Sequence, residues 1–370
     1  MRRVLGAIFI VSLAIGIEGL ILPLYIKDLG ATYTQVGLLG LNYMVPYVLL
    51  AVPVGIMSDR YGRKLPLIIG MSFVPVLFAL YSWAGSVSWV LILRLGQGVI
   101  EAPIWVAGET SIVELSSREE RGKALGMFGS SWATGFAAGP LIGGFLYTFI
   151  SAGNSFLICA VISIPAIVLL GTARFSKTGS YTSIPKIDFR KILLPGLIAF
   201  TYAGVIGVII TLFPPYGREL GMTEAVVGGL VTIFSMTRAI FLTPIGHLVD
   251  KIKRRKITLV SLSGSAIGFA ALGFVVNFVL IGLILGILAI LGCVLYPITG
   301  TMFSDIGSER GMGYAFGIYN AIWMGGWGLF PSIGGRLADV VSSSAPYLMC
   351  AGVLFFIAVF SWFLMDRSKS

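Results

Sequence analysis

Charged residues are scarce in this chain: Asp, Glu, Lys and Arg make up 11% of its 370 residues, whereas a soluble domain usually carries about 25%. With so few charges the chain cannot cover a soluble domain with a hydrated surface. Its hydrophobic content of 57% is correspondingly high. The composition therefore excludes an ordinary soluble domain and predicts a protein embedded in a lipid bilayer.

Groups that bind metals or form disulfides are also rare, because the chain has one histidine and three cysteines. Cys159, Cys293 and Cys350 lie far apart in apolar runs, without the spacing of metal ligands. We expect free structural thiols, no metal site and no cofactor. The sequence also lacks a GxxxxGK[ST] nucleotide-binding loop and a nucleophile elbow, so we expect neither an enzyme nor an ATP-driven pump.

Long apolar runs are what the chain has in abundance. About 20 apolar residues cross the hydrocarbon core as an α-helix, and this rule predicts an all-α membrane protein with twelve transmembrane helices. The expected spans of the first half are 4–26, 36–57, 65–84, 88–111, 124–148 and 153–173. Those of the second half are 192–213, 225–247, 257–277, 279–301, 313–335 and 345–365. The first run contains Glu18 and is too long for a signal peptide, so we interpret it as the first membrane helix.

The positive charges predict how these helices are oriented. With twelve spans both termini lie on one side, and only Lys27, Arg218 and Arg336 fall in the loops of the opposite side. Positively charged loops face the cytoplasm, so we expect a multi-pass protein of the cell membrane with cytoplasmic N- and C-termini. Topology then explains the net charge of +10, and we expect no nucleic-acid partner.

The chain also repeats itself at an offset of 191 residues. Gly55, Asp59 and Lys64 return as Gly246, Asp250 and Arg255; Leu29, Gly30 and Thr32 return as Leu220, Gly221 and Thr223; Pro140, Gly143 and Gly144 return as Pro331, Gly334 and Gly335. Such parallel repeats are typical of transporters whose substrate site lies near the midplane, between the repeats. We expect an N-terminal six-helix bundle at 1–173, a cytoplasmic linker at 174–191 and a C-terminal six-helix bundle at 192–370, which together act as a monomer.

The segment GIMSDRYGRK at 55–64 and its degenerate copy GHLVDKIKRRK at 246–256 carry a family resemblance. In this topological position they resemble the major facilitator superfamily, in particular its twelve-helix drug:proton antiporters, over essentially the whole chain. The matching residues are Gly55, Asp59, Arg60, Gly62, Arg63 and Lys64. The resemblance implies a gate on the cytoplasmic side, with Asp59 near Arg310 and, by symmetry, Asp250 near Arg121. The alternative for the basic residues is that they anchor the loop on anionic lipid.

The span 88–111 contains polar residues that a membrane helix normally excludes. Its segment RLGQGVIEAPIW at 94–105 resembles a second motif of the family through Arg94, Gln97 and Gly98. Arg94 and Glu101 are seven residues apart and so share one helix face, with Gln97 between them. The resemblance associates this arginine with proton coupling. The alternative is a structural charge that holds backbone carbonyls or a carboxylate in place.

The remaining membrane charges break the repeat: Glu18 aligns with Ile209, Glu101 with Gly292 and Arg238 with Tyr47. Counting from the membrane faces places Glu18 and Arg94 in the outer half, where they could pair or compete for a proton. Glu101 and Arg238 lie nearer the middle. A carboxylate in such a place changes its protonation with desolvation and with the distance to an arginine. We hypothesise that Glu18 or Glu101 exchanges protons while the other contacts substrate; permanent structural ion pairs are the alternative.

Glycines recur every four residues in the span 124–148, at Gly135, Gly139 and Gly143. This spacing predicts a smooth face for close helix contact, next to Pro140, which interrupts the backbone hydrogen bonds. With Gly144, the segment resembles the motif of family members that export substrates in exchange for protons. A general packing face is the alternative.

The resemblance implies a secondary active transporter, specifically a proton-coupled antiporter that exports small organic, drug-like compounds by alternating access. Its partners would be a small-molecule substrate, protons and the lipid bilayer. A proton-coupled or facilitative importer of a nutrient or metabolite is the alternative within transport. A receptor that uses the same scaffold without transporting anything is a third possibility.

Overall fold

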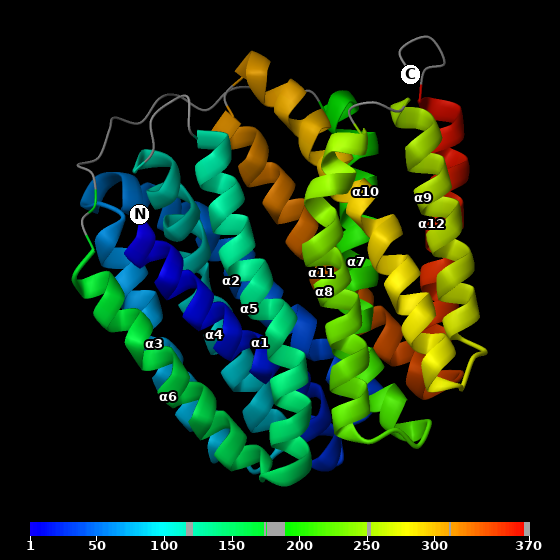
Figure 1. Ribbon diagram of the computed structural model, residues 1–370, viewed down its shortest axis with the longest axis horizontal. Helices are drawn as coiled ribbons and strands as arrows, with labels where there is room; N and C mark the ends of the chain where they lie inside the picture. The colour runs from blue at the N-terminus through cyan, green and yellow to red at the C-terminus, as the bar shows by residue number, and fades with distance from the viewer. Residues whose placement is uncertain (116–120, 174, 176–188, 250–252, 311, 366–370) are drawn as a thin grey trace. The chain divides into compact units, whose positions relative to one another are not determined.

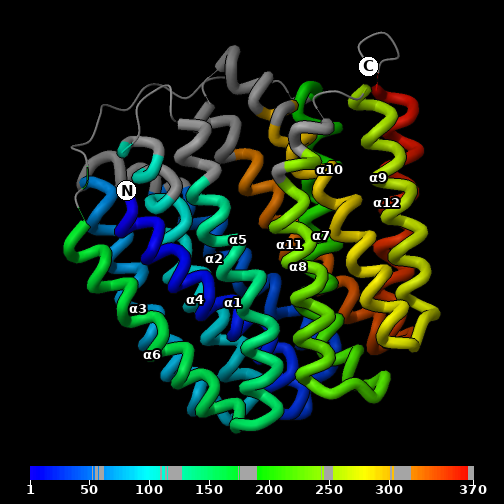
Figure 2. Tube along the Cα trace, viewed as in Figure 1, coloured from blue at the N-terminus to red at the C-terminus, as the bar shows by residue number. Residues whose placement is uncertain are grey.

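The computed structural model describes residues 1–115, 121–173, 175, 189–249, 253–310 and 312–365, and for parts of some helices it describes the backbone alone. These residues form twelve α-helices, with no strand among them (Figures 1 and 2). The first six are α1 (Arg2–Asp28), α2 (Tyr33–Tyr61), α3 (Lys64–Ser82), α4 (Val87–Glu114), α5 (Arg121–Phe149) and α6 (Ala152–Gly171). The second six are α7 (Phe189–Glu219), α8 (Glu224–Val249), α9 (Arg254–Leu272), α10 (Phe278–Arg310), α11 (Met312–Val340) and α12 (Ala345–Leu364).

The prediction of an all-helical membrane protein is confirmed. In the described part of the chain, nine of the helices are long and apolar enough to cross a membrane. Several helices run beyond the expected spans: α10 has 33 residues where the sequence predicted 279–301. A helix can continue into the polar region because each further turn keeps its backbone hydrogen bonds within the helix.

The chain forms two compact units. Unit 1 contains residues 1–31, 41–182 and 223–232, and unit 2 contains residues 32–40, 183–222 and 233–370. The first residues of α2 therefore group with the second unit, and those of α8 group with the first. The expected linker at 174–191 lies mostly outside the described residues, and the division of the chain at that segment stays a prediction.

The helix contacts within the two units follow the repeat. In unit 1, α1 packs on α5 and α6, and α3 packs on α4 and α6. In unit 2 the same pairs recur with six added to each label: α7 packs on α11 and α12, and α9 packs on α10 and α12. The pairs α3 with α6 and α9 with α12 can be followed in Figure 1. The sequence repeat thus corresponds to a repeated packing scheme.

The best-matched stretch of the repeat forms the same turn twice. Gly30 and Gly221 have φ of 87° and 82°, a left-handed conformation that glycine adopts at the ends of helices without a steric penalty. The N–H of the residue after each glycine reaches back to a helix carbonyl five residues earlier, over 3.1 Å in both turns. Thr32 and Thr223 then accept hydrogen bonds from the first turns of α2 and α8. Glycine and threonine recur because the turn needs both.

The start of α2 has a further cap from a distant helix. The Asp339 carboxylate, one residue before the end of α11, accepts hydrogen bonds from the backbone N–H groups of Tyr33 and Thr34, each at 2.7 Å. It also accepts one from the Thr34 hydroxyl at 2.6 Å. These donors are the backbone groups that a helix leaves unsatisfied at its N-terminus. The carboxylate therefore fastens the start of α2 to α11 within unit 2.

Candidate functional site

Glu18 owes its position to an unusually close helix crossing. The glycine ridge of α5 lies against α1 so tightly that a Cβ atom built on Gly139 would stand 2.3 Å from the Gly16 carbonyl carbon. A Cβ on Gly135 would be 2.7 Å from the Leu13 nitrogen. Only residues without a side chain permit such a distance between backbones. The ridge therefore fixes α1 two residues before Glu18, which is fully buried.

Arg94 reaches Glu18 from α4. Its guanidinium donates a hydrogen bond to the Glu18 carboxylate at 3.0 Å and another to the side-chain oxygen of Gln97 at 2.7 Å. It also lies 5.0 Å from the centre of the Tyr43 ring, a favourable position for a cation. Arg94 is 8% exposed, so its charge is balanced by protein groups.

Gln97 connects the two carboxylates. Its amide nitrogen donates to Glu18 at 3.2 Å and to Glu101 at 2.8 Å. Its oxygen accepts hydrogen bonds from Arg94 and, at 2.9 Å, from the Tyr81 hydroxyl. An amide has two hydrogens to donate, so both are used, and the two donors on its oxygen fix which way it points. Gln97 is the hub of the network.

The hydrogen-bond donors that the structure describes around Glu101 are neutral. Besides Gln97, its carboxylate accepts hydrogen bonds from the Tyr43 hydroxyl and the Trp105 indole, both at 3.0 Å. Tyr43 comes within reach because α2 crosses α4 at Gly98, where a Cβ atom would stand 2.3 Å from the Tyr43 carbonyl oxygen. Glu101 is 3% exposed. The glycine of the second motif therefore positions a hydrogen-bond donor for Glu101.

The network contains two carboxyl groups and one guanidinium, all buried within unit 1. If every group were ionised, the cluster would carry one uncompensated negative charge, and burial disfavours such a charge. A single proton on either carboxyl group removes it. The arrangement can therefore hold one exchangeable proton.

The structure brings together four of the predicted site residues, namely Glu18, Arg94, Gln97 and Glu101. Sequence reasoning missed Tyr43 and Tyr81, because hydrogen bonds between helices distant in sequence leave no local signal. Trp105 carried such a signal: it lies four residues after Glu101, on the same face of α4.

Arg238, the fifth predicted site residue, lies in unit 2 and is described with that unit alone. Its guanidinium is 5.7 Å from the centre of the Tyr202 ring and 5.6 Å from that of Phe234. Its backbone carbonyl accepts a weak hydrogen bond from the Cys293 thiol at 3.6 Å. The surroundings of Arg238 are aromatic, whereas those of Arg94 are acidic and polar.

The predicted cytoplasmic gate falls mostly outside the described side chains. Asp250 lies outside the described residues, and side chains are not described for Gly55, Asp59, Arg60, Arg121 and Arg310. The pairs of Asp59 with Arg310 and of Asp250 with Arg121 therefore stay predictions. Three motif residues are described in full: Gly62 has φ of 90°, Arg63 is buried, and the Lys64 ammonium donates to the Gly171 carbonyl at 3.0 Å.

The antiporter-like glycines of α5 divide between two neighbours. Gly135, Gly139 and Gly143 face α1, whereas a Cβ atom on Gly144 would stand 2.7 Å from the Glu224 carbonyl oxygen at the start of α8. The backbone of Pro140 contacts the same stretch of α8, because its carbonyl oxygen would lie 2.5 Å from a Cβ atom on Gly228. The packing face predicted from the glycine spacing is present, and its relation to export stays a prediction.

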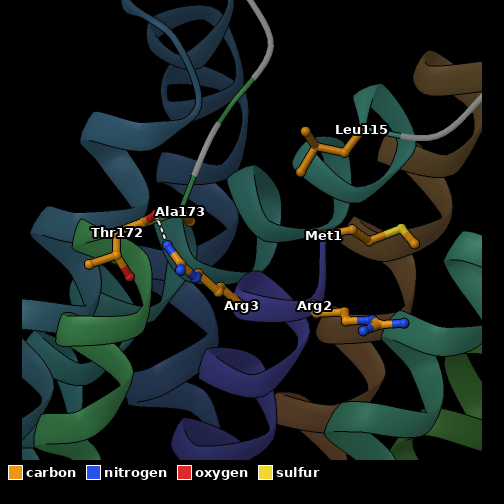
Figure 3. A pocket seen from close by; sticks show the side chains of 6 residues that line it. All are labelled: Met1, Arg2, Arg3, Leu115, Thr172 and Ala173. Atoms are coloured by element: carbon orange, nitrogen blue, oxygen red, sulfur yellow. Dashed lines mark hydrogen bonds between the residues drawn. The ribbon is translucent and has the colours of Figure 1, made fainter.

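A cleft with a volume of about 390 Å³ opens at the start of α1 (Figure 3). It is lined by Met1, Arg2, Arg3, Leu115, Thr172 and Ala173. Figure 3 shows Arg3 pointing to the carbonyl oxygen of Thr172, to which it donates a hydrogen bond. This cleft shares no residue with the network around Gln97.

Comparisons with known proteins identify the family to which the chain is similar. The family model described as Major Facilitator Superfamily matches residues 4–192 and 196–370. An uncharacterized MFS-type transporter of Methanocaldococcus jannaschii is 23% identical over 373 residues, 97% of this chain and 96% of that protein. Quinolone resistance protein NorA of Staphylococcus aureus is 26% identical over 368 residues, 94% of this chain and 91% of that protein.

Solved structures show the same fold. A bacterial homolog of the human lysosomal transporter Spinster, in an inward-facing and occupied conformation, superposes with a TM-score of 0.82. The superposition covers 98% of this chain and 95% of the homolog, at 16% sequence identity. The unoccupied form of a bacterial Spinster homolog gives a TM-score of 0.74.

Proposed function

Because the chain belongs to the major facilitator superfamily, and is thus a multi-pass membrane transporter and not an enzyme, we propose that it exports small amphipathic organic compounds in exchange for protons. The observation that carries this proposal is the buried network of two carboxyl groups and one guanidinium. Transport proceeds by alternating access across the cell membrane, with both chain termini in the cytoplasm.

The network suits proton exchange because its two acids have different partners. Glu18 depends on the Arg94 guanidinium, whereas Glu101 depends on three neutral donors. A movement of α1 against α4 would separate Glu18 from Arg94 and leave a buried carboxylate without a cation, which favours protonation. The return movement restores the ion pair and releases the proton. In this proposal Glu18 and Glu101 hold the proton in turn, linked through Gln97.

Two observations support export over import. The glycine and proline segment of α5 resembles that of exporters, and it forms the crossing that positions Glu18. The relative from Staphylococcus aureus is named for resistance to quinolones, which are amphipathic organic compounds. We therefore propose compounds of this chemical type as substrates.

Inside-out membrane vesicles test the proposal. With an acidic lumen, vesicles that contain the chain should accumulate a fluorescent quinolone, and collapse of the proton gradient should release it. Glu18→Gln and Glu101→Gln should each reduce gradient-driven uptake at least about tenfold, because glutamine does not ionise and cannot hold the exchanged proton. Glu224→Gln, at the start of α8 and outside the network, is the control that should transport normally.

Two results would contradict the proposal. If gradient-driven uptake is unchanged in both Glu18→Gln and Glu101→Gln, the network does not couple transport to protons. Uptake of compounds into whole cells that depends on the chain, with no export of any compound tested, would make it an importer.

A further inference from the structure

Arg238 lies on the protein-facing side of α8. Phe234 and Ile245 are buried and stand four residues before and seven residues after it, and this spacing places all three on one helix face. The exposed apolar side chains on the opposite face of α8 are those of Ile233, Met236 and Ile240. Arg238 itself is partly buried, and Phe241, three residues after it, is exposed. Its guanidinium lies against the rings of Tyr202 and Phe234, which are both buried, and is therefore directed toward α7.

Aromatic rings from two helices hold the guanidinium. Phe234 comes from α8 itself, and Tyr202 comes from α7. Tyr202 fits because of Gly292 on α10, where a Cβ atom would stand 2.8 Å from a carbon of the tyrosine ring. Gly292 occupies the position that corresponds to Glu101 in the repeat. At the position where unit 1 has the Glu101 carboxylate, unit 2 therefore has the ring of Tyr202, which lies near the Arg238 guanidinium.

The described side chains of unit 2 provide no carboxylate for this cation. Among them the acidic ones are Glu219 and Asp339, which lie at the ends of α7 and α11. Glu219 is 17 residues beyond Tyr202 on α7, about 25 Å along the helix. Asp339 is occupied by the start of α2. Aromatic rings stabilise a cation by about 0.5–2 kcal/mol, whereas a hydrogen bond to a charged group contributes about 1.5–3 kcal/mol, so a carboxylate would be a stronger partner.

We propose that Arg238 binds a carboxylate group of the transported compound, with the rings of Tyr202 and Phe234 against its adjoining apolar part. The guanidinium is planar and can donate two parallel hydrogen bonds to a carboxylate, and this geometry selects carboxylates over uncharged groups. The substrate class is then amphipathic organic acids and zwitterions. This inference rests on the proposed transport of small organic compounds.

Binding of a matched pair of probes tests the inference. A fluoroquinolone and its methyl ester differ in the carboxylate alone, and titration of the purified protein in detergent with each, followed by fluorescence, gives two dissociation constants. Arg238→Gln should weaken binding of the acid about 10- to 100-fold, as expected for the loss of a charged hydrogen-bond donor. Binding of the ester should change by less than about threefold, because it makes no charged contact with Arg238.

Arg238→Lys keeps the charge but loses the planar fork, so it should weaken binding of the acid less than Arg238→Gln does, again with little effect on the ester. This variant and the ester titration separate a loss of contact from a loss of folding. Equal weakening of acid and ester in Arg238→Lys, or unchanged binding of the acid in Arg238→Gln, would overturn the inference.

The same variants separate this inference from the proposed function. Binding of the acid that depends on Arg238, in a protein that exports neither probe, would uphold the carboxylate site and refute export. Export of acid and ester that is equally insensitive to Arg238→Gln would uphold export and refute the carboxylate site.

Discussion

Replacing Gly139 by alanine should separate the two helices that position Glu18. A Cβ atom at this position would lie 2.3, 2.5 and 2.6 Å from three backbone atoms of Gly16 and Ile17. Carbon atoms in contact prefer about 3.5–4.0 Å, so the helices would have to move apart by roughly 1 Å. Because the obstacle is backbone, no change of side-chain rotamer can relieve it.

The cost of Gly139→Ala can be compared with that of a substitution on α1 that lies outside the crossing. Overpacking of a close contact costs about 1–3 kcal/mol, whereas the change from glycine to alanine favours a helix by up to about 1 kcal/mol. Gly19 on α1 has no atom within 4 Å of an added Cβ. Gly19→Ala therefore gains the helix preference without the clash. The difference between the two variants should be about 1–3 kcal/mol, with Gly139→Ala the less stable.

Thermal unfolding of the two purified variants in detergent, followed by tryptophan fluorescence, measures this difference. Gly139→Ala should unfold at a lower temperature than both the wild type and Gly19→Ala. A shift of α1 would also lengthen the 3.0 Å contact between Glu18 and Arg94, so gradient-driven transport should fall. Equal melting temperatures for the two variants would refute the close crossing of α1 and α5.

Three further substitutions follow from the described contacts. Asp339→Ala should reduce the stability by about 0.5–2 kcal/mol, because the start of α2 loses its carboxylate cap. The melting temperature should fall, and an unchanged melting temperature would contradict this. Gly30→Ala should cost about 1–2 kcal/mol because of its φ of 87°, and a melting temperature equal to that of Gly19→Ala would refute the strain. Gln97→Met should abolish gradient-driven uptake and lower stability, because four hydrogen bonds of the network lose a partner; full transport by this variant would remove Gln97 from the site.

The sequence was sufficient to predict most of the architecture. Helices in a bilayer need apolar runs of a fixed length, and the two halves repeat residues with a physical purpose, such as Gly30 and Gly221 at left-handed turns. The apolar runs and the turn residues are each recognised from residues that lie close together in the sequence. Helix ends were less predictable, since α10 continues to Arg310 through polar residues that the apolar rule excludes.

The candidate site could be predicted only where one helix carried its residues. Arg94, Gln97 and Glu101 share a face of α4, so their proximity followed from helix geometry. The donors Tyr43 and Tyr81 come from α2 and α3, and no spacing within the sequence indicates such a contact. The cap of α2 by Asp339 was missed for the same reason, as it joins residues 306 positions apart.

The central claim is that the two buried carboxyl groups hold the proton that is exchanged for substrate. Its most direct test is to add a fluoroquinolone to the purified protein in weakly buffered detergent solution and to measure the protons released. The wild type should release protons when the compound binds, and the double variant Glu18→Gln with Glu101→Gln should bind it without releasing any. Proton release of the same size from the double variant would contradict the account.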